Sequence, residues 1–111
     1  MILTAIAFLS LAALLGMFLL SFVVTGKETP KAIVFTHGPL AAIGLVLLII
    51  YVFKNSPGPI ESVVLFTIAA IAGIVMVYKD LTGKKIPKVL AIAHGIIAII
   101  GFVFLLIFAF R

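Results

Sequence analysis

Four long uncharged stretches, separated by short segments that hold almost all of the charge, dominate the chain. The stretches cover residues 1–24, 32–53, 60–78 and 89–110, and Glu61 at the edge of the third is the only charged residue in them. A helix needs about 20 mainly apolar residues to cross a bilayer. Barrel strands would instead alternate in polarity. The pattern therefore predicts an all-α membrane protein with four transmembrane helices in an up-down bundle.

The amino-acid composition also indicates a membrane protein. The chain has 111 residues, of which 66% are hydrophobic and 10% charged, and it has no cysteine. Soluble domains are about 45–50% apolar and about 25% charged. These values exclude a water-soluble enzyme, a disordered tail and a disulfide scaffold. We therefore expect a single transmembrane domain over residues 1–111, embedded in the lipid bilayer.

The cations are distributed unevenly between the connecting segments. Segments 25–31 and 79–88 lie on one side of the predicted bundle and hold six lysines, whereas the other side has only Lys54 and Arg111. The positive-inside rule predicts that the two lysine-rich segments are cytoplasmic and that both termini lie outside. We expect the inner membrane of a bacterium or an archaeon. The net charge of +5 suits an anionic lipid surface and gives no reason to expect nucleic-acid binding.

The chain matches itself without a gap when it is shifted by 57 residues. Residues 1–54 then align with 58–111, and several short polar motifs coincide in one register. The shared motifs are Thr25-Gly26-Lys27 with Thr82-Gly83-Lys84, Pro30-Lys31 with Pro87-Lys88, and His37-Gly38 with His94-Gly95. Biased composition does not explain these matches. We predict two parallel helical-hairpin repeats related by an axis along the membrane normal; a working unit of two hairpins from different chains stays open.

Small residues and one proline add detail to this bundle. Ala12 and Gly16 in the first repeat, like Ala69 and Gly73 in the second, have the small-x-x-x-small spacing that lets membrane helices approach closely. Pro39 has no counterpart in the second repeat, and we expect it to kink the second helix.

Two histidines are the only strong metal ligands inside the predicted membrane layer. His37 and His94 each lie seven residues, or about 10 Å along a helix, after a proline that begins it. An ionisable side chain at that depth is costly and indicates a functional site. The same helix face continues with residues that both repeats share, namely Ala41, Gly44 and Leu48 after the first histidine and Ala98, Gly101 and Leu105 after the second.

This face predicts a cofactor site. We expect the small residues Ala41, Gly44, Ala98 and Gly101 to leave a slot for a flat macrocycle, with the histidines as axial ligands of a haem b iron. Lys31 and Lys88, six residues before the histidines, would face the haem propionates. The arrangement resembles the bis-histidine b-type cytochromes. That resemblance implies an electron carrier or haem-handling protein, with a quinone or a redox protein as partner, rather than a stand-alone enzyme.

Three other interpretations stay open at this stage. The histidines could instead form hydrogen bonds that fix helix register in a structural or assembly subunit. A histidine-dependent transporter is a second alternative, since length and span number resemble the small multidrug resistance exporters, although their membrane-embedded glutamate is absent from the first stretch. A zinc site is not favoured, because two histidines supply only half of the four ligands of a tetrahedral site. The phenylalanine-rich faces could meet lipid or another copy of the chain in a homo-oligomer.

Overall fold

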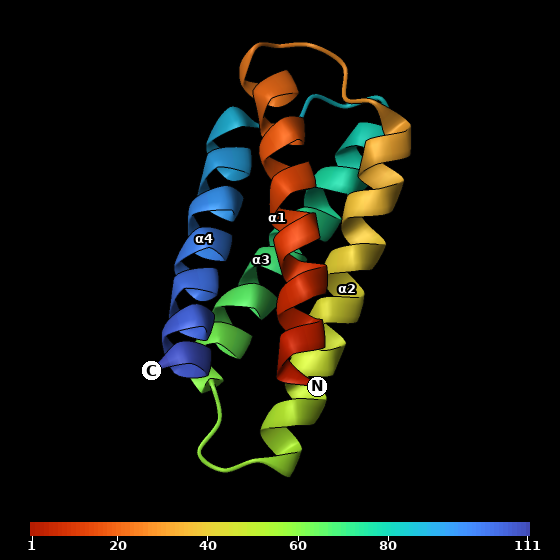
Figure 1. Cartoon of the computed structure of the whole chain (residues 1–111). Helices are drawn as coiled ribbons and strands as arrows, with labels where there is room; N and C mark the ends of the chain where they lie inside the picture. Colours follow the sequence, from red (N-terminus) through yellow and green to blue (C-terminus); the bar gives the residue numbers. More distant parts are fainter.

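The computed structural model describes all 111 residues and contains four α-helices and no strand. Each helix is 22 to 24 residues long and apolar enough to cross a membrane, as predicted. Figure 1 shows both termini and the connection between the second and third helices at one end of the molecule, with the other two connections at the opposite end. The helices are α1 (Ile2–Val24), α2 (Lys31–Lys54), α3 (Ile60–Leu81) and α4 (Lys88–Phe110).

Repeated sequence motifs mark the helix ends. Pro30 and Pro87 directly precede α2 and α4 with φ of −70° and −62°, which matches the fixed φ of proline. Gly26 and Gly83 follow the ends of α1 and α3 with φ of +73° and +77°. In both places the next amide donates a hydrogen bond five residues back, at 2.8 Å. The repeated Thr-Gly-Lys motif is therefore a Schellman-type helix stop, in which glycine provides the left-handed residue.

The charged ends of the apolar stretches belong to the helices. Lys31 and Lys54 are the first and last residues of α2, and α3 extends through Lys79 and Asp80 to Leu81. The third helix was expected over about residues 60–78, and it ends three residues later because backbone hydrogen bonding continues past the apolar stretch. The second helix is continuous through Pro39.

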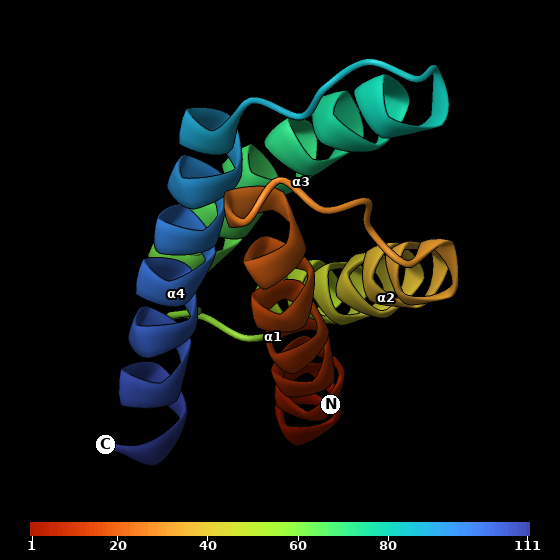
Figure 2. The ribbon, with the colours of Figure 1, turned by 90° about the horizontal axis from the view of Figure 1, so that it is seen from above.

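The helices pack most extensively within the hairpins α1–α2 and α3–α4. Between the hairpins, α1 contacts α4 and α2 contacts α3, whereas the backbones of the diagonal pairs do not approach closely. The molecule measures 43 × 22 × 19 Å. In the view from above in Figure 2, α1 and α4 run in one direction and α2 and α3 in another, so the two helices of each hairpin are inclined to one another.

The packed core lies at one end of the bundle. We call residues 2–12, 43–54, 60–69 and 100–110 the termini half, and residues 13–24, 31–42, 70–81 and 88–99 the loop half. Ten of the thirteen buried residues belong to the termini half, and Ala91 is the only buried residue in the helices of the loop half. The large buried side chains, Leu9, Leu48, Phe66 and Leu105, form one cluster with Ala5 in the termini half.

The ten buried residues of the termini half form five pairs with a spacing of 57 residues. The pairs are Ala5 with Ser62, Leu9 with Phe66, Ala12 with Ala69, Gly44 with Gly101, and Leu48 with Leu105. The two hairpins therefore bury equivalent positions of their sequences.

Candidate histidine site

The two histidines lie next to one another in the loop half. The ring centroids of His37 on α2 and His94 on α4 are 6.3 Å apart, and the ring planes are inclined by 79°. Because the backbones of α2 and α4 are not in close contact, the imidazole rings bridge the diagonal of the bundle. The sequence prediction that both histidines face the interior at equal depth agrees with this placement.

Each imidazole is anchored to the other helix of its own hairpin. The Nδ1 atom of His37 is 2.8 Å from the carbonyl oxygen of Ala12, and that of His94 is 2.7 Å from the carbonyl oxygen of Ala69. A carbonyl oxygen only accepts hydrogen bonds, so each Nδ1 must be the protonated donor. In the neutral ring, the lone pair is then on Nε2.

The Nε2 atoms have no hydrogen-bond partner in the chain. Ser62 Oγ is the only buried side-chain nitrogen or oxygen without a partner, so the Nε2 atoms keep some accessible surface. Histidines that bind a metal typically donate the other ring N–H to a carbonyl or carboxylate, which fixes tautomer and orientation. Both imidazoles meet that condition.

Two glycines make room for the rings. A Cβ atom added to Gly16 would lie 2.9 Å from Cε1 of His37, and one added to Gly73 would lie 3.3 Å from Cε1 of His94. The small-x-x-x-small pairs therefore lie at a close approach between helices, as predicted. In each hairpin, the group that lies against the glycine is the histidine ring.

The glycines beyond the histidines are filled by neighbouring side chains. A Cβ atom on Gly44 would lie 2.7 Å from Cγ of Leu9, and one on Gly101 would lie 3.1 Å from Cβ of Leu65. The prediction that these glycines leave an empty slot was therefore wrong. The residues on one face of a helix do not show which side chain of a neighbouring helix fills the space beside a glycine. Gly44 and Gly101 are helix-packing positions, whereas Ala41 and Ala98, one turn nearer to the histidines, are half-buried.

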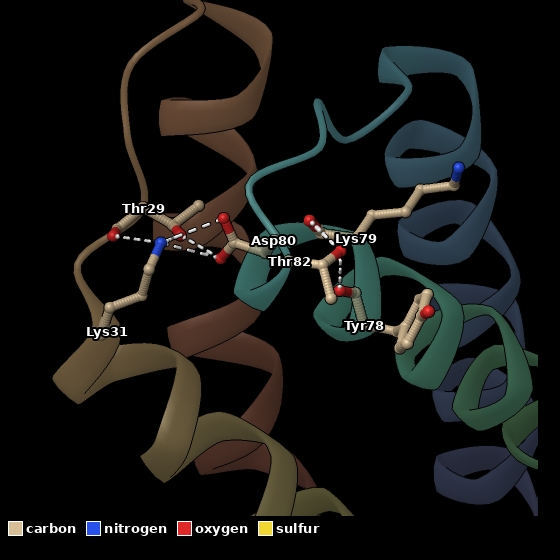
Figure 3. A network of polar contacts seen from close by, with 6 residues as sticks. All are labelled: Thr29, Lys31, Tyr78, Lys79, Asp80 and Thr82. Carbon is tan, nitrogen blue, oxygen red and sulfur yellow. Dashed lines mark hydrogen bonds and ion pairs between the residues drawn. The ribbon is translucent and has the colours of Figure 1, made fainter.

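The two predicted lysines differ in their surroundings. Lys31 Nζ lies 3.0 Å from each carboxylate oxygen of Asp80, and Thr29 Oγ1 donates to Asp80 Oδ2 at 2.6 Å, as Figure 3 shows. This is the only salt bridge in the chain, and Lys88 has no partner. Of the two lysines, only Lys88 is therefore free to meet an anionic group.

Sequence reasoning missed Thr29 and Asp80. The available signal was the break in the repeat, since the counterparts of these residues are Ile86 and Val23. Asp80 was assigned to a loop, so its position in the last turn of α3 beside the start of α2 was not expected.

The site offers two nitrogen ligands and no more. No group of three or more His, Cys, Asp or Glu side chains is arranged to hold a metal ion. The two rings are direct neighbours, with centroids 6.3 Å apart and planes inclined by 79°. A metal with two axial protein ligands needs its other positions filled by a macrocycle, as in haem. The donor set fits a haem iron, while Gly44 and Gly101 are not available to line the macrocycle.

Comparison with protein-family models, with curated proteins and with solved structures finds no match for this chain. The functional argument therefore depends on the geometry of the site.

Proposed function

We propose that this chain is a small b-type cytochrome-like membrane protein in which His37 and His94 hold one haem. The observation that carries the proposal is the pair of neighbouring imidazoles, with centroids 6.3 Å apart, whose Nδ1 atoms are both paired with backbone carbonyls. This pairing leaves two Nε2 lone pairs as ligands. A haem iron held by two imidazoles supplies a one-electron redox centre.

The chain's own residues would orient that centre. Gly16 and Gly73 fix the rings against α1 and α3, and the ammonium of Lys88, which has no partner in the chain, would be available to pair with a propionate. The redox partner would be a quinone in the lipid layer or a protein. A second cofactor or a partner would be needed to carry electrons across the whole bilayer, because the histidines lie in one half of it.

We also propose that the chain is an internal repeat and that it has one orientation in the membrane. The two hairpins are copies of one unit, supported by the five buried pairs and by the two equivalent histidine contacts. The lysine-rich connections face the cytoplasm of a bacterial or archaeal cell by the positive-inside rule. The haem would then lie nearer the cytoplasmic surface.

The visible spectrum of the purified protein tests the haem proposal. We expect a Soret band and an α band that appears on reduction, and we expect each of His37→Ala and His94→Ala to abolish this bis-histidine signature. Thr36→Ala, at the exposed neighbour of the first histidine, is the control and should keep the spectrum. Iron-free protoporphyrin should bind less well than haem if ligation of the iron drives binding.

A colourless protein from haem-sufficient cells, still colourless after haem titration, would contradict the proposal. The same outcome would favour a second function, in which the histidines act as hydrogen-bonding links that fix helix register. The Nδ1 contacts with Ala12 and Ala69 support that alternative directly. In that case His→Asn variants, whose side-chain amide can replace the Nδ1 donor, should keep the stability that His→Ala variants lose.

A further inference from the structure

The loop half contains a second polar group besides the histidines. Thr29, Lys31 and Asp80 form one network, which we call the clasp, between the start of α2 and the end of α3. Lys31 Nζ lies within 3.0 Å of Thr29 Oγ1 and of both Asp80 carboxylate oxygens, and also 3.3 Å from the Thr29 carbonyl oxygen. In Figure 3 these side chains point toward one another, whereas the neighbouring Lys79 extends away from them.

The clasp is largely removed from solvent. Thr29 is 8% exposed, and the side chain of Asp80 is 16% exposed. Charge-assisted hydrogen bonds are roughly twice as strong as neutral ones, and partial burial limits their screening by salt. The Lys31 side chain is 42% exposed, so the ion pair contributes modestly, and the shielded hydrogen bond from Thr29 to Asp80 adds to it.

The clasp provides all the hydrogen bonds that join the two hairpins. Every other long-range hydrogen bond, including both histidine contacts, stays within one hairpin. The second seam, between α1 and α4, has Val23 and Ile86 at the equivalent positions and no polar contact. The two seams between the hairpins are thus held by different forces.

The histidine pair spans the two hairpins, so its spacing depends on how they are joined. Large buried side chains, which would fix the spacing by packing, lie in the termini half. His94 is anchored to α3 through Ala69, and α3 is joined to α2 by Asp80. His37 is therefore linked to His94 through α2, the clasp, α3 and the hydrogen bond at Ala69.

We propose that Asp80 is a positioning residue that sets the distance between His37 and His94 by clasping α2 to α3. The proposal concerns the fold of the loop half and is independent of whether haem is the ligand. It also explains why the acid is present in only one repeat, since one polar link is sufficient to fix two hairpins that already share an apolar seam.

Distances between spin labels test this role. The chain has no cysteine, so labels can be attached at Phe35→Cys and Ile92→Cys, exposed positions on α2 and α4 two residues before the histidines. Asp80→Asn should shift and broaden the distance distribution of this pair. The charge swap of Lys31→Asp with Asp80→Lys should restore it.

A matched pair in the termini half separates positioning from general destabilisation. Labels at Val46→Cys and Val103→Cys join the same two helices, also at exposed positions, and should give an unchanged distribution in Asp80→Asn. If that variant fails to fold, Thr29→Val removes the two hydrogen bonds of the Thr29 hydroxyl at nearly constant volume, keeps the Lys31–Asp80 pair, and should produce a smaller shift at the first pair.

Three outcomes are informative. An unchanged distribution at positions 35 and 92 in Asp80→Asn would overturn the proposal. Equal broadening at positions 46 and 103 would also overturn it, because the acid would then stabilise the whole bundle. A shift confined to the first pair in a protein that binds no haem would support the clasp and contradict the haem function, so the two proposals can fail separately.

Discussion

The termini half and the loop half are built from the same four helices but are held together differently. In the termini half, Leu9, Leu48, Phe66 and Leu105 interdigitate at the centre. In the loop half, Ala91 is the only buried helical residue, and the long-range contacts include the histidine hydrogen bonds and the Asp80 salt bridge. Because lipid provides no hydrophobic drive between helices, close packing and polar contacts are the forces available, and this bundle uses one in each half.

The difference bears on where a ligand could bind. Sites that bind or move tend to lie in regions with few buried contacts. The termini half leaves no free volume at its glycines, since neighbouring side chains occupy it. The loop half has the unpaired Nε2 atoms and the free Lys88. A well-packed half thus supports a more open half that contains the two histidines.

The largest expected effect comes from opening the packed core. Leu48 is fully buried, and Leu48→Ala should lower the free energy of unfolding by about 2–4 kcal/mol through lost packing and the resulting cavity. Leu14→Ala, at a leucine that is 65% exposed, is the control and should change it far less. Reversible unfolding in SDS, followed by energy transfer between dyes on introduced cysteines, measures both. Equal losses would show that the termini half has no special role in stability.

A smaller effect should follow from filling a glycine in that core. Gly44→Ala places a Cβ 2.7 Å from the Leu9 side chain and 3.3 Å from its backbone nitrogen, so α1 and α2 must separate, at a cost of about 1–2 kcal/mol. A Cβ on Gly95 meets only Leu20 Cδ2, at an ordinary 3.8 Å, so Gly95→Ala should be neutral or slightly stabilising, because alanine favours helix. The same unfolding measurement compares them. A stabilising Gly44→Ala would mean that Leu9 adapts and that the contact is loose.

The smallest effect separates the two lysines of the loop half. Lys31→Gln breaks the ion pair with Asp80 and should cost about 0.5–1 kcal/mol, since the Lys31 side chain is 42% exposed. Lys88→Gln has no partner to lose and should leave stability within about 0.5 kcal/mol. In a haem titration Lys88→Gln should weaken binding through the loss of a partner for a propionate, whereas Lys31→Gln can act only through the spacing of the two histidines. Identical behaviour of the two variants in both measurements would contradict the conclusion that Lys31 has an ion-pair partner and Lys88 has none.

Much of the fold followed from local patterns. Uninterrupted apolar stretches of sufficient length can only be helices in a membrane, and the Pro-Lys and Thr-Gly-Lys motifs mark the helix starts and stops found in the structure. The shared face through His37, Gly44 and Leu48 was also correctly placed inside, because the period of 3.6 residues fixes which residues share a side.

The sequence by itself determined four apolar helices, their limits to within a few residues, and an inward histidine in each hairpin. Only the tertiary structure decided that Leu9 fills the space at Gly44, that the Nδ1 atoms bond to Ala12 and Ala69, and that Asp80 reaches Lys31. Helical periodicity is local and leaves open the rotation and height of one helix against another. Those quantities depend on side chains that are distant in the sequence, and they determine which groups meet.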